Sequence, residues 1–81
     1  MFPNQINLPF SWTVIELQCF DSNNGAWAVV PPVCFDSETP AIARFCQTCA
    51  AAAVSTLPYH AVFVLRSDGM VTERRVFDRR G

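Results

Sequence analysis

The feature that most constrains the fold is one stretch with helical period, which lies between two stretches that alternate like strands. In residues 36–57, DSETPAIARFCQTCAAAAVSTL, apolar side chains recur at the spacing of a single helical stripe. The stripe consists of Ile42, Phe45, Cys46, Cys49 and Ala53. Thr39 as the N-cap and Pro40 as the first helical residue predict where the helix begins. Pro58 predicts that the helix has ended by Leu57.

A β-hairpin is predicted before the helix. Residues 13–20, TVIELQCF, alternate as a strand does, and Asn24-Gly25 is a strong signal for a two-residue turn. Residues 27–30 form the return strand, which Pro31-Pro32 must either end or place at a sheet edge. The turn would pair Cys19 with Val30.

A second hairpin is predicted after the helix, with strands at 59–66 and 70–77 around the turn Ser67-Asp68-Gly69. The predicted fold class is therefore α+β, with the order β-β-α-β-β. Its two hairpins form a four-stranded antiparallel sheet, and the one helix packs across one face. The 81 residues make a single domain. Residues 1–12 are expected to be an extended N-terminal arm, and residues 78–81 a frayed C-terminal tail.

Alternation sorts the side chains of each hairpin into two faces. In the second hairpin one face holds Ala61, Phe63, Leu65, Thr72, Arg74 and Val76. The other holds His60, Val62, Val64, Arg66, Val71, Glu73, Arg75 and Phe77. We expect the helix to cover Ala61, Phe63, Leu65 and Val76, and in the first hairpin Ile15, Leu17 and Cys19. In the first hairpin, the uncovered face would then carry Val14, Phe20, Trp27 and Val29. This surface is so apolar that either the N-terminal arm or another chain should cover it.

Composition excludes several function classes. The chain has 51% hydrophobic and 16% charged residues, so disorder is not expected. Its net charge of −1 argues against binding to bulk nucleic acid. No apolar run is long enough to span a membrane and no signal peptide is recognised, which favours a cytosolic protein with reduced thiols. His60, the sole histidine, is expected to pair near Phe77 in a packing role, and no nucleophile–base–orienter trio can be assembled.

Cys46-x-x-Cys49, together with Cys19 and Cys34, raises the possibility of a four-cysteine zinc site. The predicted register places the two strand cysteines about 13 Å apart, too far for one ion. The CxxC pair also lies inside the helix rather than at its N-terminus, where a redox thiol would be activated. We therefore expect four small buried thiols and no metal or other cofactor, with the zinc site as the alternative.

The remaining candidate site is a surface on which arginines flank apolar residues, as protein-binding hot spots do. The candidate partner-binding residues are Arg66, Glu73, Arg74, Arg75, Trp27 and Phe20. Across residues 13–77, the size and the β-β-α-β-β order resemble those of small bacteriophage inhibitors of the anti-CRISPR type. The resemblance implies a non-enzymatic inhibitor in the host bacterial cytosol that binds a type I CRISPR surveillance complex. It would block target-DNA binding or nuclease recruitment.

Other interpretations stay open. The chain could be a zinc-stabilised module, or a dimerising phage accessory or structural protein, and it could act as a monomer or a homodimer. Many anti-CRISPR proteins mimic DNA with dense acidic surfaces. Seven acidic and six basic residues do not fit that strategy, so a wedge on a protein surface is the preferred version. No sequence-specific contact with nucleic acid is expected.

Overall fold

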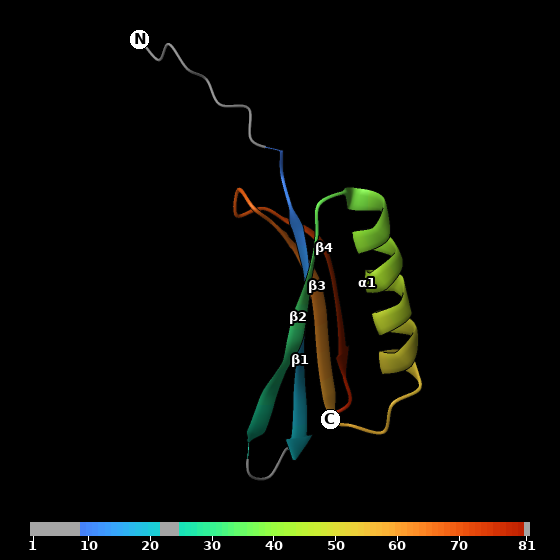
Figure 1. Cartoon of the computed structure of the whole chain (residues 1–81). Helices are drawn as coiled ribbons and strands as arrows, with labels where there is room; N and C mark the ends of the chain where they lie inside the picture. Colours follow the sequence, from blue (N-terminus) through green and yellow to red (C-terminus); the bar gives the residue numbers. More distant parts are fainter. Residues whose placement is uncertain (1–8, 22–24, 81) are drawn as a thin grey trace, which may run out of the picture.

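Four antiparallel strands and one helix form the chain in the computed structural model, which describes residues 9–21 and 25–80. In chain order the elements are β1 (Trp12–Asp21), β2 (Ala26–Phe35), α1 (Glu38–Ala53), β3 (Tyr59–Arg66) and β4 (Val71–Asp78). The strands form one sheet in the order β2-β1-β3-β4, and α1 lies along one side of it (Figure 1). This confirms the predicted α+β fold.

The strand β2 is an edge strand and runs through both prolines instead of ending at them. Val14 pairs with Val33 and Glu16 with Val30, so Pro31-Pro32 together oppose the single residue Ile15. This is a β-bulge, and it places two residues without an N–H where the ladder is already interrupted. The predicted return strand at 27–30 is therefore too short, and the edge placement is the correct one of the two expected outcomes.

The predicted register of the first hairpin is wrong. Cys19 pairs with Trp27 and not with Val30, and the two strands close at Asp21 and Ala26. The connection therefore holds four residues, 22–25, and not a two-residue turn. Of the predicted turn, Asn24 lies outside the described residues, and Gly25 has a φ of +62°, a conformation that favours glycine.

The predicted register of the second hairpin is confirmed over most of its length. His60 pairs with Phe77 and Val62 with Arg75. Gly69 takes a φ of +95° in the turn. A bulge near the turn shifts the pairing at the start of β4, so that Val71 faces Leu65. The two predicted sets of side chains thus share faces as expected, except at this bulge.

Both ends of the helix differ from the expectation. The N-cap is Ser37 in an extended conformation rather than Thr39, and Pro40 is the third helical residue. Proline is still tolerated there, because the first four N–H groups of a helix have no partner within it. The helix stops at Ala53, short of Leu57. Ser55 explains the early stop, since its Oγ accepts a hydrogen bond from the N–H of Leu57 and holds a turn instead.

The C-terminal tail, expected to fray from residue 78, holds the end of the helix. Asp78 is the last residue of β4. The Arg79 guanidinium donates hydrogen bonds to the carbonyl oxygens of Ala52 and Ala53, at 2.9 and 3.0 Å. A cation at these carbonyls satisfies acceptors that the helix leaves free and lies at the negative end of its dipole.

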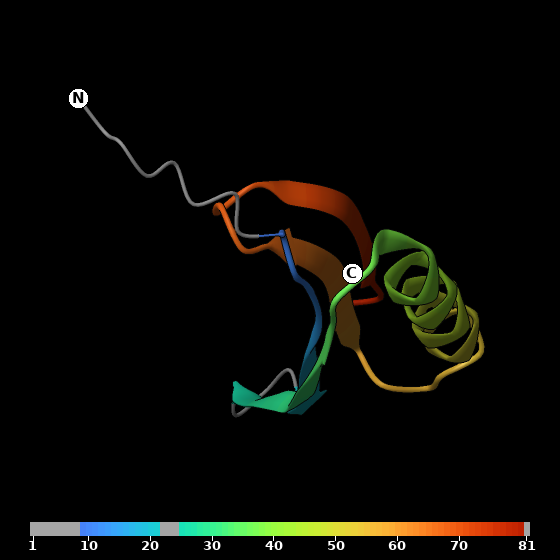
Figure 2. The ribbon, with the colours of Figure 1, turned by 45° about the horizontal axis from the view of Figure 1, so that its top comes forward.

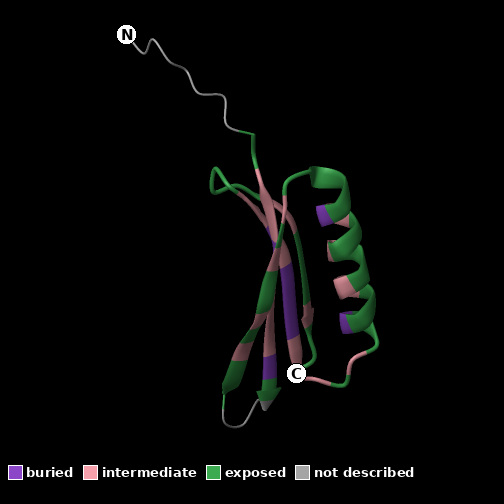
Figure 3. Cartoon of the chain, viewed as in Figure 1, coloured by how far each residue is buried: buried purple, intermediate pink, exposed green. Residues whose placement is uncertain are grey.

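The core lies between α1 and the face of β1, β3 and β4 that the sequence predicts to be uncovered. Its buried members are Val14, Ala41, Val62 and Val64. Trp12, Phe35, Phe45 and Cys49 pack around them. The predicted face assignment is therefore reversed for β1 and for the second hairpin, whereas Trp27 and Val29 of β2 stay uncovered as predicted, because the register of the first hairpin differs. Figure 3 shows the buried residues on the inner side of α1 and along β3.

The reversal has a physical reason in the helix. The side that α1 presents to the sheet carries Ala41 and Ala52, which are 0% and 1% exposed, and only Phe45 and Cys49 of the predicted stripe pack against the core with them. Cys46 and Ala53 of that stripe are exposed. Alanines allow the helix to approach the sheet closely, and a narrow gap is filled by valines better than by longer side chains.

Candidate functional site

The candidate site is the face of the sheet that α1 does not cover, which we call the open face. Since Val14, Val62 and Val64 pack toward the helix, their neighbours along each strand point to the other side. The open face comprises Thr13, Ile15, Leu17 and Cys19 of β1, Trp27, Val29 and Cys34 of β2, Tyr59, Ala61, Phe63 and Leu65 of β3, and Arg74, Val76 and Asp78 of β4. Figures 1 and 2 show the helix on one side of the sheet only.

The middle of the open face is apolar. The β1–β3 register places Ile15 opposite Phe63 and Leu17 opposite Ala61. These cross-strand pairs cover part of each other's surface, and the side chains at the margins are more open. Val29 of β2 is 57% exposed and Val76 of β4 is 46% exposed. An apolar surface that continues across all four strands is typical of a protein-binding site.

One end of the open face is closed by an aromatic cluster. The rings of Trp27 and Tyr59 meet edge to face, with centroids 5.0 Å apart. Both residues pair with Cys19, whose side chain is 1% exposed. The Arg80 guanidinium lies 5.7 Å from the Trp27 ring and 4.6 Å from the Tyr59 ring, within the range of cation–π attraction.

Asp78 holds Arg80 in that position. Arg80 donates hydrogen bonds from Nε and a terminal nitrogen to the two carboxylate oxygens of Asp78, at 2.9 and 3.0 Å. These bonds lower the pKa of the Asp78 carboxyl to about 2. The pair therefore remains charged near neutral pH, and the arginine stays over the aromatic rings.

The structure divides the six predicted partner-binding residues among four places. Trp27 and Arg74 lie on the open face. Glu73 and Arg75 alternate with Arg74 along β4 and therefore lie on the helix side of the sheet. Phe20 is exposed near the end of β1.

Arg66 lies at the hairpin end of β3 and is occupied within the chain. Its guanidinium donates two hydrogen bonds to the carboxylate of Asp68, at 2.8 and 2.7 Å, and lies 4.3 Å from the Phe10 ring. The bonds lower the pKa of the Asp68 carboxyl to about 2. These contacts order the turn, and they place Arg66 away from Trp27.

The four cysteines are free and lie on both sides of the sheet. Cys19 and Cys34 share the open face. Cys34 pairs with Thr13, which lies six positions before Cys19 in β1. At the rise of a strand, the two cysteines are therefore about 20 Å apart along the sheet. Cys46 and Cys49 belong to the helix, behind the sheet, so the fold gives no position from which all four could bind one zinc ion. The expectation of four buried thiols is also wrong, since Cys34 and Cys46 are exposed.

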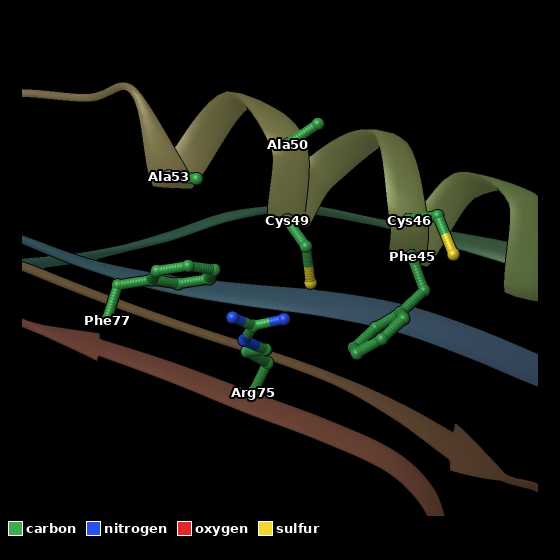
Figure 4. A pocket seen from close by; sticks show the side chains of 7 residues that line it. All are labelled: Phe45, Cys46, Cys49, Ala50, Ala53, Arg75 and Phe77. Atoms are coloured by element: carbon green, nitrogen blue, oxygen red, sulfur yellow. The ribbon is translucent and has the colours of Figure 1, made fainter.

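A groove of about 310 Å³ runs between α1 and β4. Its lining comprises Phe45, Cys46, Cys49, Ala50, Ala53, Arg75 and Phe77. The Cys49 thiol and the Arg75 guanidinium point toward each other across it (Figure 4). Burial raises the pKa of the Cys49 thiol, and Arg75 opposes that shift only in part. A thiol that stays protonated near neutral pH is a poor nucleophile.

His60 is buried on the helix side of the sheet and interacts with Glu16 of β1. Its Nδ1 lies 2.6 Å from a carboxylate oxygen of Glu16, and the ring is 3% exposed. The pairing of β1 with β3 places the two residues near each other. The sequence offers only the alternation along each strand, which does not identify these two residues as partners.

Neither a cation centre nor a membrane span emerges within residues 9–21 and 25–80. No group of three or more histidine, cysteine or acidic side chains is placed there to hold a metal ion. No helix in this part of the chain has the length and apolar character needed to cross a membrane. Comparison with models of protein families, with curated proteins and with solved structures gives no match.

Proposed function

We propose that the chain is a non-enzymatic protein-binding module that docks its partner on the open face. The observation that carries the proposal is the distribution of side chains between the two faces of the sheet. The helix covers a centre of valines with Trp12 and Phe35 packed around it. Ile15, Leu17, Phe63 and Leu65 lie on the side that no described element covers. Burying such side chains against a partner removes apolar surface from water, and this drives most protein association.

The charges on the open face indicate the chemistry of the partner. Arg74 is exposed beside Val76, and no carboxylate of the described residues forms a salt bridge with it. Arg80, by contrast, is bound to Asp78. A complementary protein surface would have an apolar centre and an acidic group at the edge that meets β4.

The resemblance in size and architecture to anti-CRISPR proteins names the first partner to test, a type I CRISPR surveillance complex. Binding there would occlude the DNA path or the site of nuclease recruitment without turnover. The purified chain should then co-elute with the complex and prevent it from binding target DNA in a gel-shift assay.

Val29→Glu tests the surface itself. Val29 is 57% exposed on the edge strand of the open face, so a charge there should disturb the partner and not the fold. We expect affinity to fall at least about tenfold, as for a desolvated contact residue. Val54→Glu is the matched control, because Val54 is 83% exposed at the end of the helix. Undiminished affinity of Val29→Glu would show that the open face is not the contact surface. Absence of any binding would remove the CRISPR complex as the partner.

A further inference from the structure

The two edges of the sheet differ in whether another strand can add to them. The β2 edge carries Pro31-Pro32 and a bulge, both of which are features that protect an edge from pairing. The β4 edge has no proline, and its pairing with β3 is regular from Glu73 to Asp78. Among the described residues β4 pairs only with β3, so the outer edge of β4 presents backbone donors and acceptors that no described strand uses.

From this difference we infer that β4 pairs antiparallel with the β4 strand of a second copy of the chain, with Val76 on the two-fold axis. A two-fold axis perpendicular to the sheet sets one residue opposite its own copy and keeps both helices on the same side. The two sheets then join into a single continuous sheet.

Side-chain charges select the register. Centring the axis on Arg74 or on Arg75 opposes two like charges, which destabilises a strand pair. Centring it on Val76 places Arg74 opposite Asp78 of the second copy, twice by symmetry. It also places Arg75 opposite Phe77 of the second copy. Within one chain Arg75 already lies 5.1 Å from the Phe77 ring, so this pair suits cation–π contact.

The Val76-centred register also uses exposed apolar surface. Val76 is 46% exposed on the open face beside Arg74. Its two copies would meet at the axis, with an Arg74–Asp78 pair on each side. Asp78 can accept from its own Arg80 and from Arg74 of the second copy, because an ionised carboxylate has about four acceptor positions. The strand is therefore complementary to itself in charge and shape.

Charge reversal tests this pairing with the full chain. Analytical ultracentrifugation over a concentration series should show a reversible dimer. Arg74→Asp opposes two aspartates and Asp78→Arg opposes two arginines, so each variant alone should raise the dimer dissociation constant at least about tenfold. Arg44→Asp is the matched control, because Arg44 is exposed on α1. This substitution changes the net charge by the same amount as Arg74→Asp.

Mixing the two single variants gives the decisive result. One copy then supplies aspartate at both positions and the other supplies arginine at both, so every cross-strand pair is complementary. We expect the mixture to form a heterodimer although neither variant dimerises alone. Circular dichroism verifies that both variants are folded. A wild-type chain that stays monomeric at millimolar concentration would overturn the inference. So would a dimer that is indifferent to both substitutions, or a mixture that remains monomeric.

Discussion

The two faces of the sheet differ in the size of the side chains at their centres and in whether the helix covers them. The face under α1 uses valines at its centre, opposite alanines of the helix. The open face uses isoleucine, leucine and phenylalanine at the corresponding positions of β1 and β3. Larger apolar side chains would contribute more to folding if they were buried. In the proposed function, the burial of these half-buried side chains serves association with another protein.

The largest expected effect comes from placing the same charge on each face. Val64→Asp puts a carboxylate into the apolar core, at a position that is 0% exposed. This should cost more than about 3 kcal/mol and unfold a domain of this size. Val29→Asp, at a 57% exposed position on the open face, should change stability by less than about 1 kcal/mol. Urea denaturation of both variants measures the difference, and equal losses would contradict the assignment of the two faces.

Thiol labelling sharpens the description of the open face, because one part of that face is covered. Cys34 is exposed, whereas Cys19 is 1% exposed beside Trp27 and Tyr59. Under native conditions a small thiol reagent should therefore label Cys34 readily and Cys19 only slowly. Trp27→Ala should speed the labelling of Cys19 at least about tenfold, by removing one side of its cover. The matched control is Phe20→Ala, which also removes an exposed aromatic ring and should leave the rate unchanged. Fast labelling of Cys19 in the wild-type chain would show that the aromatic cluster does not protect it.

The smallest expected effect is that the aromatic cluster of Trp27 and Tyr59 loosens in acid. The pKa of Asp78 is lowered to about 2 by its hydrogen bonds with Arg80. Because the folded-state pKa is depressed, the stabilisation is present above the ordinary carboxyl range. It is lost as the pH falls from about 4 toward 2. Tryptophan fluorescence should change over this interval, and the change should be smaller in Arg80→Gln. An identical titration of the two proteins would mean that this pair does not control the cluster.

The sequence predicts the order of the elements and the register of the second hairpin, because helical period, alternation and a glycine turn are local signals. It does not predict which face the helix covers. Alternation groups Val62 with Val64 and Phe63 with Leu65, but it does not state which group meets α1. Preference for the larger side chains leads to the wrong answer, since the helix alanines set the width of the gap.

Only part of the candidate site can be predicted from the sequence. Trp27 and Arg74 could be named from the sequence, as aromatic and cationic residues of the strands. The cluster of Cys19, Tyr59 and Arg80 could not be, because it depends on the pairing of β1 with β3 and on the bulges of the first hairpin. A four-residue connection at 22–25 and the two prolines change that register, and neither effect follows from the Asn24-Gly25 signal.

Pro31-Pro32 has a consequence for how large an assembly can become. Strand addition that is possible at both edges of a sheet propagates without limit and produces fibres. In the part of the chain that the structure describes, the β2 edge carries the prolines, and we infer that strands add at the β4 edge. Association through β4 would then be complete at two copies. The two prolines would limit the assembly to a dimer.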